Sequence, residues 1–166
     1  MVNNIKDIDI RIREAISSVT DPEIPVLTIV DMGIIQSLEI NDKQVVIDIT
    51  PTYTGCPAMD TIAADIKIAL EKIGYSTDVN LVLSPAWTTD WISDAGRKKL
   101  EDYGIAAPLK ESQDKSALLD GERIVKCTNC GSNNTMMVSQ FGSTPCKALF
   151  KCEDCLEPFD YFKCLK

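Results

Sequence analysis

The seven cysteines of this chain fall into two groups that suggest different chemistry. Six lie between residues 127 and 164, whereas Cys56 stands alone in PTYTGCPAMDTIAADIKIALEKIG, residues 51–74. Histidine is absent, which removes Ser–His and Cys–His catalysis, histidine-bound metals and the usual proton shuttle near neutral pH. Without histidine, a cysteine with carboxylates is a poor hydrolytic set, but it is a reasonable set for holding a metal or a cluster transiently.

Two CxxC pairs, Cys127 with Cys130 and Cys152 with Cys155, have the spacing of a tetrahedral four-thiolate metal site. Gly131 follows the first pair and would help its tight turn. A module of about 45 residues cannot bury a sufficient core, so a metal would have to hold it together. We expect structural zinc; iron in the same geometry, two disulfides or four ordinary thiols are the alternatives.

Cys146 and Cys164 flank the second CxxC pair. If the strands on either side of that pair run antiparallel, the two cysteines would be cross-strand neighbours. Two small buried side chains are the simpler interpretation, and a redox-active pair or additional metal ligands are the alternatives.

Cys56 stands at the expected N-cap of a helix, where unpaired N–H groups and the helix dipole favour negative charge. We therefore expect a lowered thiol pKa. The preceding PTYTG loop follows a strand, at a sheet end where functional sites often gather. Asp21 and Glu23 lie on a loop bounded by prolines and could serve only as turn residues. Likewise, Cys56 could be a small buried residue.

Apolar periodicity predicts helices over residues 5–19 and 57–73, and a third that ends at Gly104. Residues 33–40 and 44–50 read as a β-hairpin, and a strand starting at residue 76 would complete a strand–helix–strand crossover. Trp87 and Trp91 are expected in the core, with partner contact as the alternative.

These elements predict an α+β fold: a small mixed β-sheet with helices packed on it, followed by a separate all-β zinc ribbon. The expected limits are 1–107 for the first domain, 108–122 for a linker and 123–166 for the ribbon. No apolar run is long enough to span a membrane, and the N-terminus lacks signal-peptide character, so we expect a cytoplasmic protein. The net charge of −8 argues against nucleic acid as a partner.

Three motifs resemble the iron–sulfur carrier and targeting family once labelled domain of unknown function 59. They are Asp21-Pro22-Glu23, Asp31-Met32-Gly33-Ile34 and Thr52-x3-Cys56-Pro57, within residues 5–83. The segments LSPAWTTDWISDAGRKKLEDYGIAAP and FGSTPCKALFKCEDCLEPFDYFKC also resemble accessory proteins of the phenylacetyl-CoA epoxidase system of aerobic bacterial phenylacetate breakdown. The resemblance makes Cys56 the functional thiol and the cofactor-binding residue, with Asp21, Glu23 and Thr52 nearby.

The resemblance implies a non-catalytic maturation factor for the di-iron centre of the oxygenase or the iron–sulfur centre of the reductase. The cargo would be iron or an iron–sulfur cluster, and the ribbon would dock onto one of these components. Because a cluster normally takes four thiolates, a homodimer or a partner would have to supply further ligands. A structural subunit of the oxygenase complex, or a thiol-dependent enzyme using Cys56, are the alternative functions.

Overall fold

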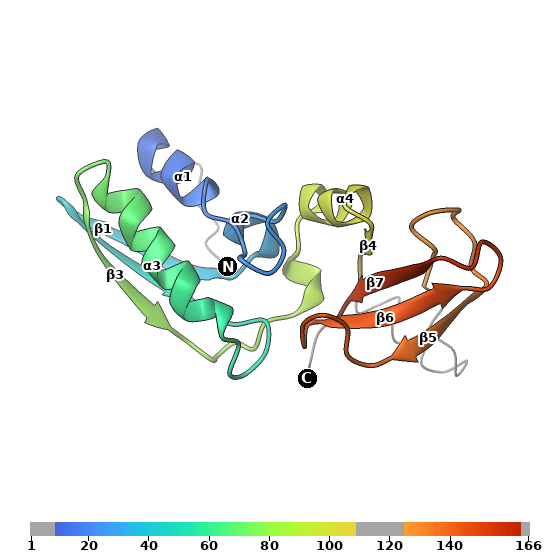
Figure 1. Cartoon of the computed structure of the whole chain (residues 1–166). Helices are drawn as coiled ribbons and strands as arrows, with labels where there is room; N and C mark the ends of the chain where they lie inside the picture. Colours follow the sequence, from blue (N-terminus) through green and yellow to red (C-terminus); the bar gives the residue numbers. More distant parts are fainter. Residues whose placement is uncertain (1–8, 109–124, 164–166) are drawn as a thin grey trace. The chain divides into compact units, whose positions relative to one another are not determined.

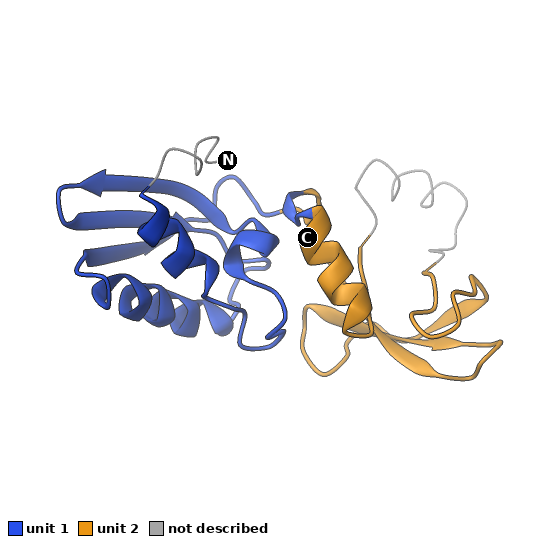
Figure 2. Cartoon of the chain, turned by 90° about the horizontal axis from the view of Figure 1, so that it is seen from above, with its two compact units in different colours: residues 1–87, 91–93 blue, residues 88–90, 94–166 orange. Residues whose placement is uncertain are grey.

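The computed structural model describes residues 9–108 and 125–163, which divide by contacts into two compact units (Figure 2). Unit 1 runs to Trp87 and includes residues 91–93, and unit 2 contains residues 88–90 and those from Asp94 onward. The α+β class is confirmed, with a small mixed sheet in unit 1 and the ribbon sheet in unit 2. The limits of the predicted domains stay a prediction, because most of the expected linker lies outside the described residues.

Unit 1 contains a three-stranded sheet of order β1-β2-β3. Strand β1 (Ile35–Asn41) and strand β2 (Gln44–Ile49) form the predicted antiparallel hairpin. Helix α3 (Ala58–Glu71) then leads to strand β3 (Ser76–Leu81), which pairs with β2 in parallel, as expected for a crossover. The parallel pairing puts the end of β2, the start of α3 and the end of β3 at one end of the sheet.

Helices cover one face of this sheet, and the core lies between them and the strands (Figure 1). The buried side chains of α3 recur at helical spacing, and those of β2 alternate along the strand: Ala58, Met59, Ile62, Ile66 and Leu70 on the helix, with Val45, Ile47 and Ile49 on the strand. Helix α1 (Ile10–Ser17) buries Ile12 and Ile16. It begins where Asp9 accepts the Arg11 N–H, and residues 5–8 of the expected helix lie outside the described residues.

A short helix that the periodicity does not predict, α2 (Ile29–Met32), gives the Asp31-Met32-Gly33 motif a structural explanation. Thr28 and Asp31 form a capping box, in which each side chain accepts the other residue's backbone N–H. Gly33 ends the helix in the left-handed region, with a φ of 66°. Four residues are too few to leave a periodic signature in the sequence.

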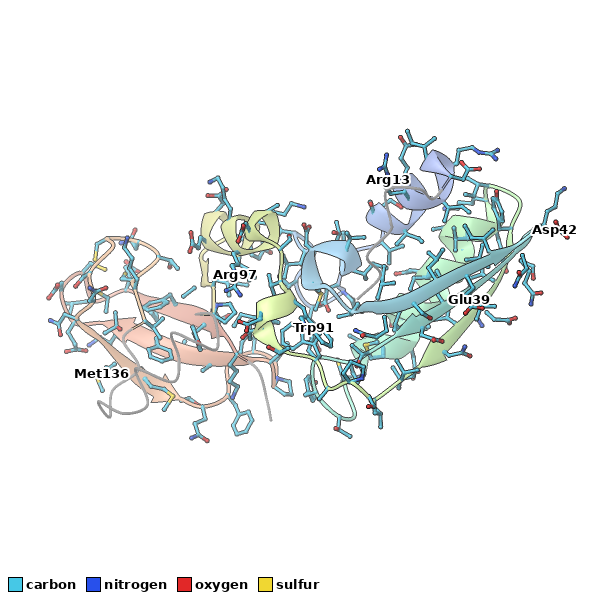
Figure 3. All side chains as sticks on the ribbon, turned by 180° about the vertical axis from the view of Figure 1, so that it is seen from behind. Arg13, Glu39, Asp42, Trp91, Arg97 and Met136 are labelled. Carbon is cyan, nitrogen blue, oxygen red and sulfur yellow. The ribbon has the colours of Figure 1, made fainter. Side chains whose placement is uncertain are left out.

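The tryptophan segment packs onto α2. The Trp87 indole N–H donates to the Met32 carbonyl at 2.9 Å, and Trp87 is buried, as expected for a core residue. The Ser93 hydroxyl donates to Asp31 Oδ1 at 3.1 Å, and its backbone N–H donates to the Asp31 carbonyl. Trp91, labelled in Figure 3, stands at the end of a 3-10 helix (Thr89–Trp91) and is half-buried. Its backbone lies against Gly33.

Unit 2 combines one helix with a four-stranded sheet of order β4-β7-β6-β5. Its elements are α4 (Asp94–Asp102), β4 (Ile105–Ala106), β5 (Thr135–Ser139), β6 (Lys147–Cys152) and β7 (Pro158–Phe162). Strand β4 pairs in parallel with β7, so Ile105 and Ala106 form part of the ribbon sheet. The Arg97 guanidinium on α4 donates to the carbonyls of Thr89 and Pro108, which ties the segments on both sides of the helix together.

Gly33 can be tested by replacement with alanine. A Cβ there would lie 2.5 Å from the Trp91 carbonyl oxygen, and the positive φ would add backbone strain. We expect Gly33→Ala to lower the free energy of unfolding by about 3 kcal/mol or more, measured by urea denaturation. Gly74→Ala is the matched control, because Gly74 also has a positive φ but no neighbour within 4 Å. It should cost only about 1 kcal/mol, and equal losses for both variants would contradict the close-approach explanation.

Candidate functional site

The loop that carries Cys56 is held by backbone hydrogen bonds at the carboxyl end of β2. The Thr50 N–H donates to the Ile34 carbonyl at 2.8 Å, which joins the start of the loop to the residue before β1. Gly55 takes a left-handed conformation with a φ of 82°, and the Cys56 N–H donates to the Tyr53 carbonyl at 3.3 Å. This turn places Cys56 just before the start of α3. The loop therefore lies at the carboxyl end of a strand, as the sequence predicts.

Cys56 precedes α3 by one residue more than expected. The helix begins at Ala58 with Pro57 as the N-cap residue, so the expectation that Cys56 is the N-cap is wrong by one position. The physical contact behind that expectation is nevertheless present, because the Ala58 backbone N–H donates to the Cys56 sulfur. The Cys56 side chain is half-buried, so its sulfur is not sealed in the core.

The surroundings raise the pKa of the Cys56 thiol, which corrects the expectation of a lowered value. Burial is the largest cause, since it disfavours the charged thiolate. Hydrogen bonds from the Ala58 N–H and the Tyr53 hydroxyl act in the opposite direction, but the Glu23 and Asp21 carboxylates add to the rise. The surroundings of Cys56 therefore favour the neutral thiol over the thiolate.

The Asp-Pro-Glu loop contributes both architecture and electrostatics. Asp21 is buried, and its Oδ1 accepts the backbone N–H groups of Glu23 at 2.7 Å and Ile24 at 2.9 Å. These bonds form the turn expected of an aspartate before proline. Because both carboxylates act on the Cys56 sulfur, the structure brings Asp21, Glu23 and Cys56 into one electrostatic neighbourhood. Thr52 is also buried, and its role at the sulfur stays a prediction.

This arrangement suits a cation. A positive ion at the sulfur would be attracted by the two carboxylates and would stabilise the thiolate that burial disfavours. A nucleophilic thiol has the opposite requirement, because it must be ionised before its substrate arrives. Tyr53, whose hydroxyl acts on the sulfur, is a functional candidate that the sequence reasoning missed. Its position three residues before Cys56, within the same turn, is the signal that could have suggested it.

The four cysteines of the CxxC pairs meet in unit 2, as predicted, and their sulfurs all lie within 4.8 Å of one another. Cys127 Sγ and Cys155 Sγ are 3.7 Å apart, and Cys130 Sγ and Cys152 Sγ are 3.6 Å apart. A tetrahedral ion with metal–sulfur bonds of about 2.3 Å requires sulfur separations of about 3.8 Å, whereas a disulfide requires about 2.05 Å. The geometry fits a four-thiolate metal ion and excludes two disulfides.

The two CxxC turns repeat one local geometry. The Cys127 N–H donates to the Ser132 carbonyl at 2.8 Å, and the Cys152 N–H donates to the Glu157 carbonyl at 3.0 Å. Both turns end in the left-handed region, at Gly131 with a φ of 76° and at Leu156 with a φ of 65°. The predicted role of Gly131 is therefore confirmed, while the second turn places a leucine where glycine is favoured.

The surroundings shift the pKa values of Cys130 and Cys155 in opposite directions. The Glu157 backbone N–H and the Asn129 side chain lower the pKa of Cys155 to about 7. A backbone N–H from Ser132 acts on Cys130 in the same direction, but desolvation and the neighbouring thiols raise its pKa to about 12. Of these two thiols, Cys155 therefore ionises more readily, and Asn129 donates to its sulfur from a distance of 3.6 Å.

Cys146 is buried beside β6, where its sulfur lies 3.0 Å from the Thr144 hydroxyl. Its carbonyl accepts the Lys163 N–H at 2.9 Å, so the flanking strands are antiparallel, as expected. Cys164 lies outside the described residues, and the pairing of the two cysteines stays a prediction.

Comparison with known proteins supports the assignment of both parts of the chain. Residues 9–81 match the iron–sulfur cluster assembly protein family, and residues 111–163 match the PaaD zinc beta ribbon domain. A crystal structure of a domain of unknown function, DUF59, from Bacillus anthracis superimposes with a TM-score of 0.51 at 26% identity. It covers 54% of this chain and 88% of that one. The two family matches thus identify an iron–sulfur cluster assembly domain followed by a zinc-ribbon domain.

Two relatives show which proteins of this class the chain resembles. A candidate subunit of the 1,2-phenylacetyl-CoA epoxidase of Escherichia coli (strain K12) is 46% identical over 90% of this chain and 89% of its own length. The Fe-S protein maturation auxiliary factor SufT of Staphylococcus aureus is 37% identical over 45% of this chain and 88% of its own length. The chain belongs to the PaaD family.

In the part that the structure describes, none of the helices combines the length and apolar character of a membrane span.

The raised thiol pKa predicts how Cys56 reacts. Its alkylation by iodoacetamide can be followed by mass spectrometry of the Cys56 peptide. Because the thiolate is the reactive form, the rate should still be rising at the pH where an ordinary thiol is already half ionised. Glu23→Gln removes one of the charges that raise the pKa, so at about pH 8 we expect alkylation about two- to threefold faster. Glu71→Gln, at the opposite end of α3, should leave the rate unchanged. A slower rate in the Glu23 variant would show that Glu23 does not raise the pKa of Cys56.

The repeated CxxC turns predict opposite responses to exchange of their left-handed residues. Gly131→Ala should lower the stability of the metal-loaded protein by about 1 kcal/mol, because a side chain disfavours that conformation. Leu156→Gly should leave stability unchanged or raise it by about 1 kcal/mol, because this leucine is 62% exposed and loses little packing. Thermal unfolding of both variants measures the difference. A destabilised Leu156→Gly would mean that its side chain makes contacts worth more than the strain.

Proposed function

We propose that this protein is a maturation factor for the metal centres of a phenylacetyl-CoA epoxidase, with iron or an iron–sulfur cluster as its cargo. The family match of residues 9–81 and the maturation-factor relative support the iron–sulfur role. The epoxidase relative that resembles nearly the whole chain supports the client. The function operates through Cys56, without catalysis of epoxidation by this chain.

The observation that carries the proposal is the half-buried Cys56 thiol beside the Asp21 and Glu23 carboxylates. The carboxylates favour a positively charged cargo and disfavour a free thiolate. The sulfur therefore becomes a ligand when the cargo arrives and recovers a proton when the cargo leaves. A proton that competes for the sulfur limits how tightly the cargo is held, which suits a donor.

A single thiolate leaves the other coordination positions of the cargo open. A cluster normally takes four protein ligands, so a partner has to complete the set during loading and delivery. In this scheme, the Ala58 N–H and the Tyr53 hydroxyl favour the charged form of the sulfur, while the two carboxylates supply the local field. The open positions allow a recipient protein to bind the cargo before Cys56 releases it.

The four-thiolate site has a different role. Cys127, Cys130, Cys152 and Cys155 would hold zinc, which when bound supplies a closed structural crosslink without a position for substrate. The ribbon would then serve as a docking module for an oxygenase or reductase component.

Two other functions make different demands. A thiol-dependent enzyme using Cys56 is disfavoured, because its raised pKa leaves the nucleophile protonated and no histidine is available as a base. A structural role within the oxygenase complex is the second candidate, and it is supported by the relative that is itself a candidate epoxidase subunit. In that case the thiol would be incidental.

Replacement of Cys56 tests the proposal. Oxygenase and reductase components are co-expressed with the wild-type chain, with Cys56→Ser, or with Thr54→Ala as a matched control, because Thr54 is an exposed residue of the same loop. We expect Cys56→Ser to lower the iron content and epoxidase activity of the client to roughly a tenth or less, the scale on which loss of a metal ligand acts. Thr54→Ala should have no effect.

The outcomes separate the candidates. Full iron content and activity with Cys56→Ser would falsify the carrier role. If the variant also co-purifies stably with the catalytic components, the structural function replaces it. Iron determination by mass spectrometry and a visible spectrum of the anaerobically purified clients provide the measurement.

A further inference from the structure

The two CxxC turns, residues 127–130 and 152–155, are joined by side-chain contacts as well as by the meeting of their sulfurs. In each turn, the residue before the second cysteine reaches toward the other turn. Asn129 of the first turn donates through its side-chain amide to the Cys155 sulfur at 3.6 Å. Asp154 of the second turn accepts hydrogen bonds from two residues that follow the first turn. The turns are therefore linked by side chains in both directions.

Asp154 makes the tighter of these links, because both of its carboxylate oxygens take part. The Ser132 hydroxyl donates to Oδ2 at 2.5 Å, and the Asn134 side-chain amide donates to Oδ1 at 2.6 Å. Hydrogen bonds to an ionised acceptor are shorter than those between neutral groups and about twice as strong. The carboxylate therefore fastens the segment before β5 to the turn after β6 at two points.

The two donors to Asp154 also shape the backbone around the first turn. The Ser132 carbonyl accepts the Cys127 N–H at 2.8 Å, and the Ser132 hydroxyl oxygen accepts the Asn134 N–H at 2.9 Å. The Asn134 carbonyl accepts the Glu153 N–H at 2.9 Å. The backbone that positions the first cysteine pair is thus tied to the middle of the second turn. A displacement of Asp154 would therefore move both pairs relative to each other.

We infer that Asp154 is a positioning residue of the metal site, which holds the two cysteine pairs at the separation that a four-thiolate ion requires. The inference rests on the proposed zinc role of these cysteines. Residues 131–151 form a loop between the pairs, and closing such a loop costs conformational entropy. Links that hold the ends of the loop together reduce the cost that remains when the ion binds.

A purely electrostatic effect of Asp154 would have the opposite sign. Four thiolates outweigh the charge of one Zn²⁺, so the loaded site is negative and a nearby carboxylate is unfavourable on charge alone. Glu153 separates the two effects, because it carries the same charge in the same turn. Its carboxylate lies 3.4 Å from the Lys151 ammonium, which belongs to β6 rather than to the first turn.

Zinc affinity of the full chain, measured by competition with a chelator, tests the inference. Residues that orient metal ligands typically change the affinity by about 10- to 100-fold. Asp154 is exposed, so we expect Asp154→Ala to raise the zinc dissociation constant about tenfold, at the lower end of that range. Glu153→Ala, the matched control, should leave it within about twofold, the scale of an exposed charge.

Ser132→Ala removes one of the two hydrogen bonds to Asp154 while keeping the carboxylate. It should weaken zinc binding in the same direction as Asp154→Ala, but by a smaller factor. Because the two residues form one link, the double variant should lose less affinity than the product of the two single losses. This non-additivity would be absent if each residue acted separately.

A second measurement distinguishes positioning from a general loss of stability. The visible absorption bands of the cobalt(II)-loaded protein depend on the geometry of the four sulfurs around the ion. Asp154→Ala should shift these bands. Phe150→Leu is the matched control, because Phe150 is buried in the ribbon core against the Phe159 ring. It should lower the thermal stability and leave the bands unchanged.

Weaker zinc binding by Asp154→Ala and Ser132→Ala, together with shifted cobalt bands, supports the positioning role. The inference is overturned if Asp154→Ala binds zinc like Glu153→Ala, or if weaker binding comes with unchanged bands. If Asp154→Ala does not fold, the same two measurements on Ser132→Ala decide the question. A wild-type chain without zinc affinity would instead contradict the proposed zinc role, and the inference with it.

Discussion

The Cys56 sulfur is placed between influences that oppose each other. Burial and the carboxylates of Asp21 and Glu23 disfavour its negative form, whereas the Ala58 N–H and the Tyr53 hydroxyl favour it. Burial dominates, so the resting site is neutral at the sulfur and negative around it. The loop of residues 50–57, the turn at Asp21 and the start of α3 all serve to bring these groups together. This balance of burial, carboxylates and hydrogen-bond donors at Cys56 favours a cationic ligand over a free thiolate.

The scaffold around that site depends on one close approach. Gly33 leaves room for the backbone of Trp91, and Asp31 both caps α2 and accepts from Ser93. Two of the family motifs therefore have different physical roles. The Asp-x-Gly motif positions the tryptophan segment, while the Asp-Pro-Glu motif forms a turn whose carboxylates reach the sulfur electrostatically.

The features that sequence reasoning predicted correctly are those encoded by local spacing. The CxxC pairs specified the four-sulfur site, and alternation along residues 44–49 specified a half-buried strand. The errors concern properties that arise only when distant segments meet. The direction of the Cys56 pKa shift depends on Glu23 and on burial, neither of which is visible at the helix start. Likewise, the Met136–Val138 run has the apolar character of a core strand but lies at the surface.

The metal site and strand β5 share one stretch of chain. Cys127 and Cys130 precede β5, and Cys152 ends β6, its partner strand, so a metal ion held by these cysteines would close the loop that contains the strand. A small sheet of this kind depends on its ion for folding. Loss of that one ion would therefore remove the order of the whole module rather than a single contact.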